Sequence, residues 1–424
     1  MPLKSGNKNS DGGRRGVHFG YLVVFTLVLT SFLPLSLGLS CAGIFYTAVA
    51  DSLYVGVGML SYYISILWAS TLVFLPLCGH LLARVDARVC ISGAVAVMAL
   101  DFVFLSQVNT VLQFYIGAFL MGIGVTMLLF LAPSTLVNRW FQTRAGFFIG
   151  IIMAFTGVGG VVWSAVGDAL INTIGWQQTY LVFAVLCAAT LPFTVLCISS
   201  SPSSRGLLPV GVHEHAQDKV SPAPSVGSTV HEAYRSASFY VILALAFCLN
   251  LGMGLYFLLP SYVATLPAGM ANPILGATTA SVAMAGQTLS KIALGVVGDR
   301  KMTLGFMIGL GFGLAGAAVF LMGIASTAAA LYAAAFLYGF FYGVTNVMLP
   351  IATRRVFGIR EYSTIYARIS MAASLGSIVS GFLWGTCVQI AGTYLPVFAG
   401  VSIVIALAIV LVMALSGSVR RSER

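Results

Sequence analysis

The chain has 424 residues, of which 59% are hydrophobic and only 8% are charged, and its formal net charge is +10 at pH 7. Soluble domains carry roughly a quarter charged residues, so this composition excludes an ordinary soluble protein and indicates an integral membrane protein. The long apolar runs also exclude a porin, whose strands alternate in hydrophobicity over about ten residues.

Twelve apolar segments are long enough to cross a bilayer core of about 30 Å, which requires about 20 apolar residues per helix. In chain order they cover residues 20–48, 55–79, 89–108, 111–136, 145–172, 178–198, 238–265, 273–297, 303–325, 327–350, 364–390 and 394–416. The basic residues before the first segment resemble the start of a secretory signal, but the apolar run is longer than the roughly 7 to 15 residues of a signal core. We therefore expect an all-α membrane protein with twelve transmembrane helices, the first of which is retained.

Lys and Arg residues gather on one side of the predicted membrane. They occupy both tails and every second connection between the segments, whereas the opposite loops contain none. Because cytoplasmic connections of membrane proteins carry an excess of Lys and Arg, we expect both termini in the cytoplasm. The positive charge is thus topological and indicates no nucleic-acid partner.

A polar interval divides the twelve segments into six and six. The expected organisation is a cytoplasmic tail (1–17), a six-helix bundle (18–198), a cytoplasmic linker (199–236), a second six-helix bundle (237–416) and a second cytoplasmic tail (417–424). The linker contains "HEH" at 213–215, a candidate metal site. Two histidines and one carboxylate in a polar loop are more typical of solvated side chains, so we expect no metal and no cofactor.

The two halves repeat two short motifs. "GHLLAR" (79–84) and "GVVGDR" (295–300) share the pattern G-x-x-x-x-R, and "RWFQTR" (139–144) and "RVFGIR" (355–360) share R-x-F-x-x-R, both at an offset of 216 residues. Two matches at one offset indicate that the halves are copies. Many transporters place a central binding site between such repeats.

The loops after the second and eighth segments resemble the signature loop of the major facilitator superfamily, and the resemblance covers the whole chain. "NRWFQTRAGFFIGIIMAFTGVGG" (138–160) and "RGLLPVG" (205–211) are similar to the oxalate/formate antiporter and monocarboxylate transporter branch. Two departures are visible: Ala83 stands where the first signature loop usually has an aspartate, and residues 30–45 lack the acidic residue of many monocarboxylate carriers. The resemblance implies the major facilitator fold, with two pseudo-symmetric halves.

The repeated loop motif predicts a gate on the cytoplasmic side. Gly79 and Gly295 allow helices to approach closely. Arg84 and Arg300, together with Asp299, are suited to contact carbonyl groups at helix C-termini or an acidic partner. The alternative is that these charges only set the topology, which explains any single arginine but not the repeated spacing.

Lys291 lies in the middle of the eighth segment, eight residues before Asp299 and therefore about 12 Å deep at about 1.5 Å per residue. A charge at that depth costs on the order of 2.5 to 3.5 kcal/mol and usually faces a bundle interior or a water-filled cavity. We expect Lys291 to bind the carboxylate of a small organic anion. Pairing with a protein carboxylate, or extension of the side chain to the membrane surface, is the alternative.

Polar and aromatic residues at helical spacing suggest further walls of the binding site. The candidates are Gln287, Tyr338, Tyr342, Asn346, Asn250 and Trp68. Such residues combine a few hydrogen-bond donors with an apolar wall, which suits a small anion. Each could equally serve helix packing.

Two further charges fall inside predicted segments. Asp101, in the third segment, is a candidate for proton coupling, with a hydrogen bond to a neighbouring helix as the alternative. Carriers of the oxalate type are known for a second basic residue in span eleven, which by the resemblance falls near Ala373 here. Arg368 is more than one turn earlier, and we expect it to extend to the cytoplasmic surface rather than to contact substrate.

The sequence therefore predicts a secondary active transporter, not an enzyme, that moves a small organic anion across the plasma membrane of a bacterial cell. A single buried cation favours a monocarboxylate. The alternatives are an oxalate/formate-like antiporter, a drug exporter of the same fold, for which an acid in the cavity is expected, and a receptor that binds without transport. The expected partners are the anion, the lipid bilayer, and either protons for symport or a counter-anion for antiport.

A membrane enzyme is disfavoured because all histidines lie at segment ends or in loops, where no catalytic cluster forms. They are His18, His80, His213, His215 and His231.

Overall fold

A computed structural model describes residues 18–55, 57–60, 62–211, 227–266, 273–298, 304–325 and 327–422. Within these ranges the chain is helical and contains no strand beyond two isolated backbone bridges. The expectation of an all-α protein is confirmed.

The helices fall into two groups along the chain. The first, here called the N-terminal group, contains α1 (Phe19–Thr30), the π-helix η1 (Ser31–Ser40), the short η2 (Ala42–Ile44), α2 (Phe45–Leu53), α3 (Val57–Leu60), α4 (Tyr62–Arg84), α5 (Ala87–Leu105), α6 (Val111–Val125), the π-helix η3 (Thr126–Leu131), α7 (Ala132–Trp140), α8 (Ala145–Ile174), α9 (Trp176–Ala188) and α10 (Leu191–Cys197). The short η4 (Ser203–Arg205) and α11 (Val230–Arg235) belong to the connection between the groups. The C-terminal group contains α12 (Ala237–Ala264), α13 (Pro273–Gly298), α14 (Leu304–Ile324), α15 (Ala328–Phe357), α16 (Tyr362–Ala391) and α17 (Leu395–Ser422).

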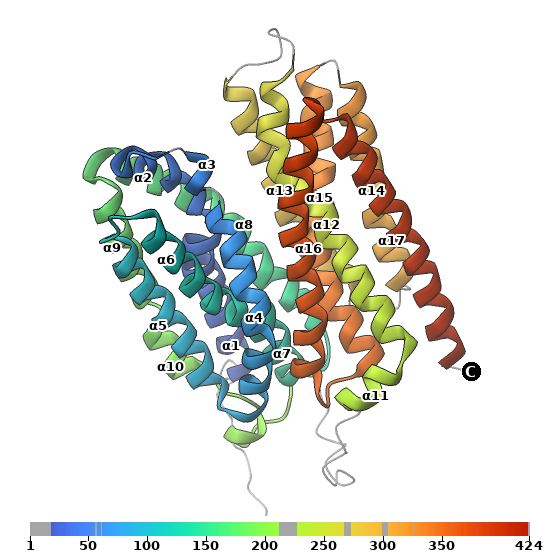
Figure 1. The fold of residues 1–424 in the computed structure, drawn as a ribbon. Coiled ribbons are helices and arrows are strands. Elements are labelled where there is room, and N and C mark those ends of the chain that lie inside the picture. The colour runs from blue at the N-terminus through green and yellow to red at the C-terminus, as the bar shows by residue number, and fades with distance from the viewer. Residues whose placement is uncertain are drawn as a thin grey trace, which may run out of the picture.

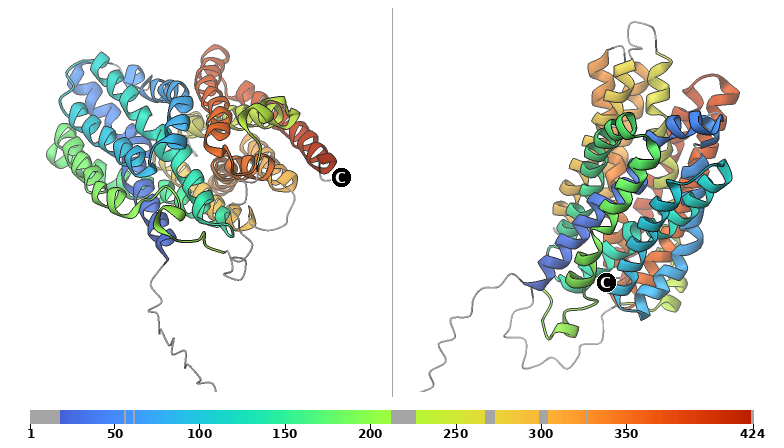
Figure 2. Two further views of the ribbon diagram at one scale, coloured as in Figure 1. Left: turned by 90° about the horizontal axis from the view of Figure 1, so that it is seen from below. Right: turned by 90° about the vertical axis from the view of Figure 1, so that its left-hand side faces the viewer.

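The two groups stand side by side with their helices roughly upright (Figure 1). The start of α1, the connecting helix α11 and the end of α17 all lie at the lower end, and α2 and α3 lie at the upper end (Figures 1 and 2). We call the lower end the terminal face. The distribution of Lys and Arg in the sequence predicts that this face lies in the cytoplasm.

The helices agree closely with the apolar segments expected from the sequence. Ten of them, within the described ranges, are long and apolar enough to cross a membrane. Two shorter apolar stretches, Ser281–Val297 and Gly311–Ile324, lie where the eighth and ninth spans were expected. The total of twelve spans and the cytoplasmic position of the termini stay predictions.

Two spans change from α-helix to π-helix within the membrane, and both changes occur beside a proline. Pro34 lies inside η1, and Pro133 is the second residue of α7, two positions after the end of η3. Proline has no backbone N–H and its ring crowds the preceding turn, so the usual helical hydrogen bond cannot form there. The hydroxyl of Ser36 donates to the carbonyl of Ser31 at 2.8 Å, which satisfies one carbonyl in the widened turn.

Glycines bring neighbouring helices into backbone contact. A Cβ placed at Gly122 in α6 would lie 2.6 Å from the carbonyl oxygen of Leu67 and 2.7 Å from the Cβ of Ser70, both in α4. Helices in a bilayer associate through such close packing because lipid supplies little hydrophobic drive. The small residue is therefore required where α4 and α6 cross.

Both described ends of the connection between the groups are hydrogen-bonded to equivalent loops. At its start, the N–H of Val210 donates to the carbonyl of Trp140 at 2.8 Å, in the first R-x-F-x-x-R loop. At its end, the N–H of Ser228 donates to the carbonyl of Phe357 at 2.8 Å, in the second such loop. The connection is thus attached to each group at the same loop of the repeat, although the two accepting carbonyls are one residue out of register. The "HEH" at 213–215 lies outside the described residues.

The loop between α4 and α5 is attached to the same connection. Asp86 caps the start of α5 by accepting from the backbone N–H of Arg88 at 2.9 Å, and it accepts from the Ser200 hydroxyl at 3.0 Å. The N–H of Arg88 holds the pKa of Asp86 below its usual value.

Gly122→Val tests the α4–α6 crossing. The added side chain would overlap the Leu67 carbonyl, so we expect the protein to lose about 1 to 3 kcal/mol of stability and to melt several degrees lower in detergent. Gly93→Val in α5 is the matched control, because a Cβ there meets no atom within 4 Å. Equal melting temperatures for the two variants would contradict this account of the crossing.

Candidate functional site

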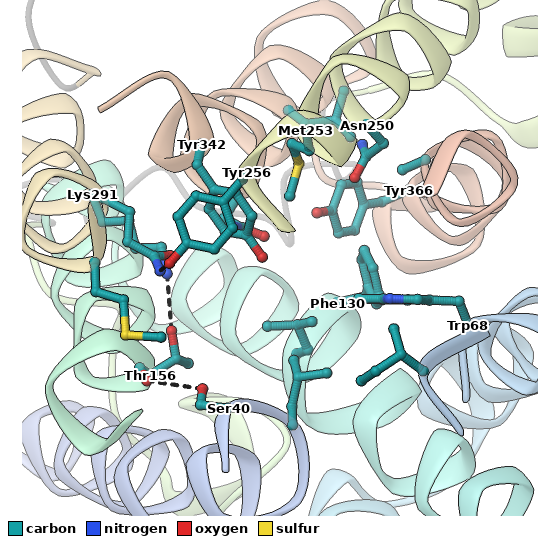
Figure 3. Close-up of a pocket in the computed structure, with 18 residues that line it drawn as sticks. Ser40, Trp68, Phe130, Thr156, Asn250, Met253, Tyr256, Lys291, Tyr342 and Tyr366 are labelled. Carbon is teal, nitrogen blue, oxygen red and sulfur yellow. Dashed lines mark hydrogen bonds between the residues drawn. The ribbon is translucent and has the colours of Figure 1, made fainter. Parts of the chain in front are cut away.

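A cavity of about 130 Å³ lies between the two groups of helices (Figure 3). We call it the central cavity. Its walls come from η1, α4, η3 and α8 of the N-terminal group and from α12, α13, α15 and α16 of the C-terminal group. Both π-helical segments contribute to it, which agrees with the frequent occurrence of π-turns at functional sites.

Lys291 is the charged residue of this cavity and is almost completely buried, with 3% of its surface exposed. Its Nζ donates to the Oγ1 of Thr156 in α8 at 2.9 Å and lies 5.9 Å from the ring centroid of Tyr342. The residues described as lining the cavity include no Asp or Glu. Within the described residues, the ammonium group is thus surrounded by a hydroxyl and an aromatic ring but by no carboxylate.

Further polar groups near Lys291 come from its own helix, α13, and from the neighbouring helices α12 and α15. The Nε2 of Gln287 donates to the hydroxyl of Tyr256 at 3.3 Å, and the rings of Tyr256 and Tyr342 have centroids 4.8 Å apart. Lys291, Tyr256, Tyr342 and Thr156 lie toward one end of the close-up in Figure 3. They make one end of the cavity polar.

The other end of the cavity is mainly aromatic. Trp68 of α4 and Phe130 of η3 meet edge to face with centroids 6.1 Å apart, and Tyr366 and Met253 lie opposite them (Figure 3). Asn250 lies beside them, where its Nδ2 donates to the carbonyl of Ala246 at 2.9 Å. A ligand in this cavity would therefore meet a cationic end and a largely apolar end.

The cavity brings together six of the seven residues that the sequence suggested as binding-site walls. They are Lys291, Gln287, Tyr342, Asn346, Asn250 and Trp68. Tyr338 lies elsewhere: it is fully buried, its hydroxyl donates to the carbonyl of Gly252, and it is not among the lining residues. It joins α15 to α12. Whether any of the seven contacts substrate stays a prediction.

Several lining residues were not foreseen from the sequence. They include Ser40, Thr156, Met253, Tyr256 and Tyr366. Met253 and Tyr256 follow Asn250 at intervals of three residues, so the face of α12 could have been extended from Asn250 by helical spacing. Thr156 is a polar residue within a run of apolar and small residues, which is a weak signal without the neighbouring helix.

Asp101 and Arg368 do not line the cavity. Asp101 is 1% exposed in α5, and within the described part of the chain its carboxylate oxygens accept no hydrogen bond. A Cβ at Gly117 would lie 3.3 Å from its Oδ1, so it faces α6. Arg368 is exposed on α16. A role of Asp101 in proton coupling stays a prediction.

Glycines close the contact between the groups on the side toward the terminal face. A Cβ at Gly79 in α4 would lie 2.6 Å from the Cβ of Ala367 in α16, and one at Gly295 in α13 would lie 2.7 Å from the carbonyl oxygen of Gly146 in α8. These two glycines occupy equivalent positions of the repeat. Each therefore permits one of two pseudo-symmetric helix contacts, α4 with α16 and α8 with α13.

A hydrogen bond reinforces this closure. The Nη1 of Arg354, at the end of α15, donates to the Oδ1 of Asn138, at the end of α7, at 2.9 Å. The two residues are separated by 216 residues, which is the offset of the repeat. Equivalent positions of the two halves therefore meet each other.

Of the two arginines expected to act in the gate, only Arg84 lies within the described residues. Arg84 is exposed at the end of α4 and has no hydrogen-bond partner among the described residues. Arg139 instead donates to the carbonyl of Leu82 in the last turn of α4 at 3.3 Å. Asp299 and Arg300 lie outside the described residues. The gating role of these residues stays a prediction.

Comparisons with known proteins give partial matches to named transporters. The chain is 29% identical to the agnestins efflux protein AgnL12 of Paecilomyces divaricatus over 28% of each chain. It is 25% identical to an MFS-type transporter of Aspergillus fumigatus over 53% of this chain and 52% of that protein. It is 26% identical to human monocarboxylate transporter 6 over 39% of this chain and 32% of that protein. The matches thus span about half or less of the length of these relatives.

A solved structure matches the fold over nearly the whole chain. The crystal structure of a variant of the E. coli fucose:proton symporter FucP matches 94% of this chain and 97% of its own chain, with a TM-score of 0.65 at 13% identity. That identity is too low to indicate a shared substrate, so the match supports the fold alone. The family model of the Major Facilitator Superfamily matches residues 28–381. The chain belongs to the Major Facilitator Superfamily.

Proposed function

We propose that this major facilitator transporter carries a small organic anion, in particular a monocarboxylate, by alternating access of the central cavity. The observation that carries the proposal is the ammonium group of Lys291, which is buried in a cavity whose described lining contains no acid. An anionic ligand supplies the countercharge that this site lacks.

Free energy favours an anion over a neutral ligand at this position. A buried charge is costly unless it is paired, and the hydroxyl of Thr156 offers only a neutral partner. A carboxylate at the same place would form a hydrogen bond in which both partners are charged, roughly twice as strong as a neutral one. The surrounding aromatic rings would contact the apolar part of the acid.

The number of cations favours one carboxylate rather than two. Ala373 lines the cavity at the position where carriers resembling the oxalate type place a second basic residue, and Arg368 is exposed on the outside of the same helix. Lys291 is thus the charged residue among those described at the cavity. An oxalate/formate-like antiporter is the second candidate. A dicarboxylate bound in this cavity would pair one carboxylate with Lys291 and leave the other without a cation.

A drug exporter of the same fold is less well supported. Drug-sized ligands occupy pockets of roughly 300 to 1,000 Å³, whereas the central cavity has about 130 Å³. A cationic drug would in addition meet the like charge of Lys291. The efflux protein among the partial matches supports export as a direction of transport, which is compatible with a small organic acid.

In an alternating-access cycle, the present arrangement corresponds to a state that is closed toward the terminal face. With the terminal face in the cytoplasm, the glycine contacts at Gly79 and Gly295 and the bond between Arg354 and Asn138 close the cavity toward the cytoplasm. We infer that these contacts separate when substrate is exchanged on that side. We further propose that transport is coupled either to protons, carried by Lys291 or Asp101, or to a counter-anion. The proposed location is the plasma membrane.

Lys291→Gln tests the anion site. In proteoliposomes offered labelled lactate, pyruvate, formate and oxalate in turn, we expect the wild type to take up at least one monocarboxylate. The variant should lose at least ten-fold in uptake of that acid, because the amide carries no charge. Arg368→Gln removes an exposed cation from α16 and should transport normally.

Normal transport by Lys291→Gln would show that the ammonium is structural. Uptake of oxalate but of no monocarboxylate would favour the second candidate.

Arg354→Leu tests the closure at the terminal face. The bond to Asn138 involves a charged group and contributes about 1.5 to 3 kcal/mol, so its loss should raise the population open to the cytoplasm roughly ten- to hundred-fold. The measurement is the rate at which maleimide labels Thr135→Cys, a buried position in α7, in a variant whose native cysteines are replaced by alanine. Arg235→Leu, an exposed arginine in α11, is the control. Equal labelling rates with and without Arg354 would refute this role.

A further inference from the structure

The hydrogen bond between Lys291 and Thr156 joins the two groups of helices across the central cavity. Lys291 belongs to α13 and Thr156 to α8. The Oγ1 of Thr156 already donates its own proton to the carbonyl of Met153 at 2.7 Å, so it can only accept from the ammonium. The bond therefore has one direction, from the C-terminal group to the N-terminal group.

Thr156 is held in place by contacts that do not involve Lys291. Its backbone carbonyl accepts from the hydroxyls of Ser36 at 3.2 Å and Ser40 at 3.3 Å, both in η1. The contact between Thr156 and Ser40 is visible beside the Lys291 bond in Figure 3. The threonine is thus a fixed acceptor on the wall of the cavity.

The backbone of Lys291 is held at the same crossing. A Cβ at Gly150 would meet the carbonyl of Lys291, and one at Gly157 would meet the hydroxyl of Thr288. With both backbones fixed by the contact of α8 with α13, the bond between the two side chains exists only while that contact is closed. Separation of the helices would remove the acceptor from the ammonium.

A carboxylate entering the cavity competes with Thr156 for the ammonium. The hydroxyl is neutral, whereas a carboxylate forms the stronger charge-assisted bond. Because the ammonium can turn toward the ligand, anion binding would remove the hydrogen bond by which Lys291 joins α13 to Thr156 of α8. The competition thus gives ligand binding a direct effect on the helix contact.

We propose that Thr156 is a latch that holds the Lys291 ammonium in the empty cavity and releases it when an organic anion binds. This inference rests on the proposed function and adds to it the step by which the anion promotes opening toward the terminal face. Thr156 is a positioning residue, because it acts through Lys291. The ligand class that operates the latch is a small carboxylate that can reach the Nζ of Lys291.

Thr156→Val tests the latch because it keeps the shape of the side chain and removes the acceptor. Lactate, pyruvate, formate and oxalate are titrated one at a time into the purified full-length chain, and binding is measured by calorimetry. For the acid that the wild type binds, we expect Thr156→Val to bind about ten-fold more tightly, which corresponds to about 1.4 kcal/mol. Thr156→Ser keeps the hydroxyl and should bind as the wild type does.

Thr288→Val is the matched control at the same crossing. The hydroxyl of Thr288 donates to the carbonyl of Met284 within its own helix at 2.9 Å, so its removal leaves the ammonium unaffected. We expect unchanged affinity. Tighter binding in both valine variants would assign the effect to packing and would overturn the latch.

A second measurement uses the labelling of Thr135→Cys, which reports opening toward the terminal face. In the wild type the acid should accelerate labelling several-fold. In Thr156→Val, labelling should already be fast without acid and the acid should add little. The same acceleration by acid in both proteins would overturn the proposal.

The binding measurements distinguish a failure of the proposed function from a failure of the latch. If no acid binds the wild type, or if Lys291→Gln binds the acid as well as the wild type does, the proposed function fails and the latch fails with it. If Lys291→Gln loses binding while Thr156→Val binds with unchanged or weaker affinity, only the latch is wrong.

Discussion

The buried ammonium of Lys291 is the constraint on which the arrangement of the central cavity depends. A cation in the membrane interior must have partners, and within the described residues its hydrogen-bond partner is the hydroxyl of Thr156 on the opposite group of helices. This places α13 against α8 and brings a π-helical segment, through Ser36 and Ser40, into the same network. The cavity and the contact between the two groups are thus parts of one structure.

Small residues make this structure possible. Gly150 and Gly295 let α8 and α13 meet through their backbones, and Gly79 allows the corresponding contact of α4 with α16. A side chain at any of these positions would hold the groups apart. Lipid tails can cover the apolar surface of a helix as well as another helix can. Separating such a contact therefore costs little hydrophobic free energy. That property suits contacts that are exchanged during transport.

Much of the fold could be derived from the sequence because its physical causes are local. The apolar length of each segment and the charges between segments determine where helices begin and end, and observed bounds such as those of α8 and α12 differ from expectation by few residues. Lys291 was expected to face the interior of the bundle, and it lines the central cavity. The π-helical turns were not foreseen, although Pro34 and Pro133 mark both of them.

The composition of the site was less accessible to sequence reasoning because it depends on how helices far apart in the chain meet. Tyr338 shares a helical face with Tyr342, yet its hydroxyl bonds to Gly252 and it packs away from the cavity. Thr156 carries no sequence signal that distinguishes it from other hydroxyls in apolar helices. Arg354 and Asn138 occupy equivalent positions of the two halves and contact each other. The sequence repeat shows that the positions are equivalent, but it does not show that the symmetry axis between the halves passes close to them.

The most direct test of the central claim is an electron cryomicroscopy map of the protein with a bound monocarboxylate. We expect density for the acid in the central cavity, with a carboxylate oxygen about 2.7 to 2.9 Å from the Nζ of Lys291, the usual length of a charge-assisted bond. Density for the acid at another position, with Lys291 still bonded to Thr156, would contradict the assignment of the ammonium as the anion site.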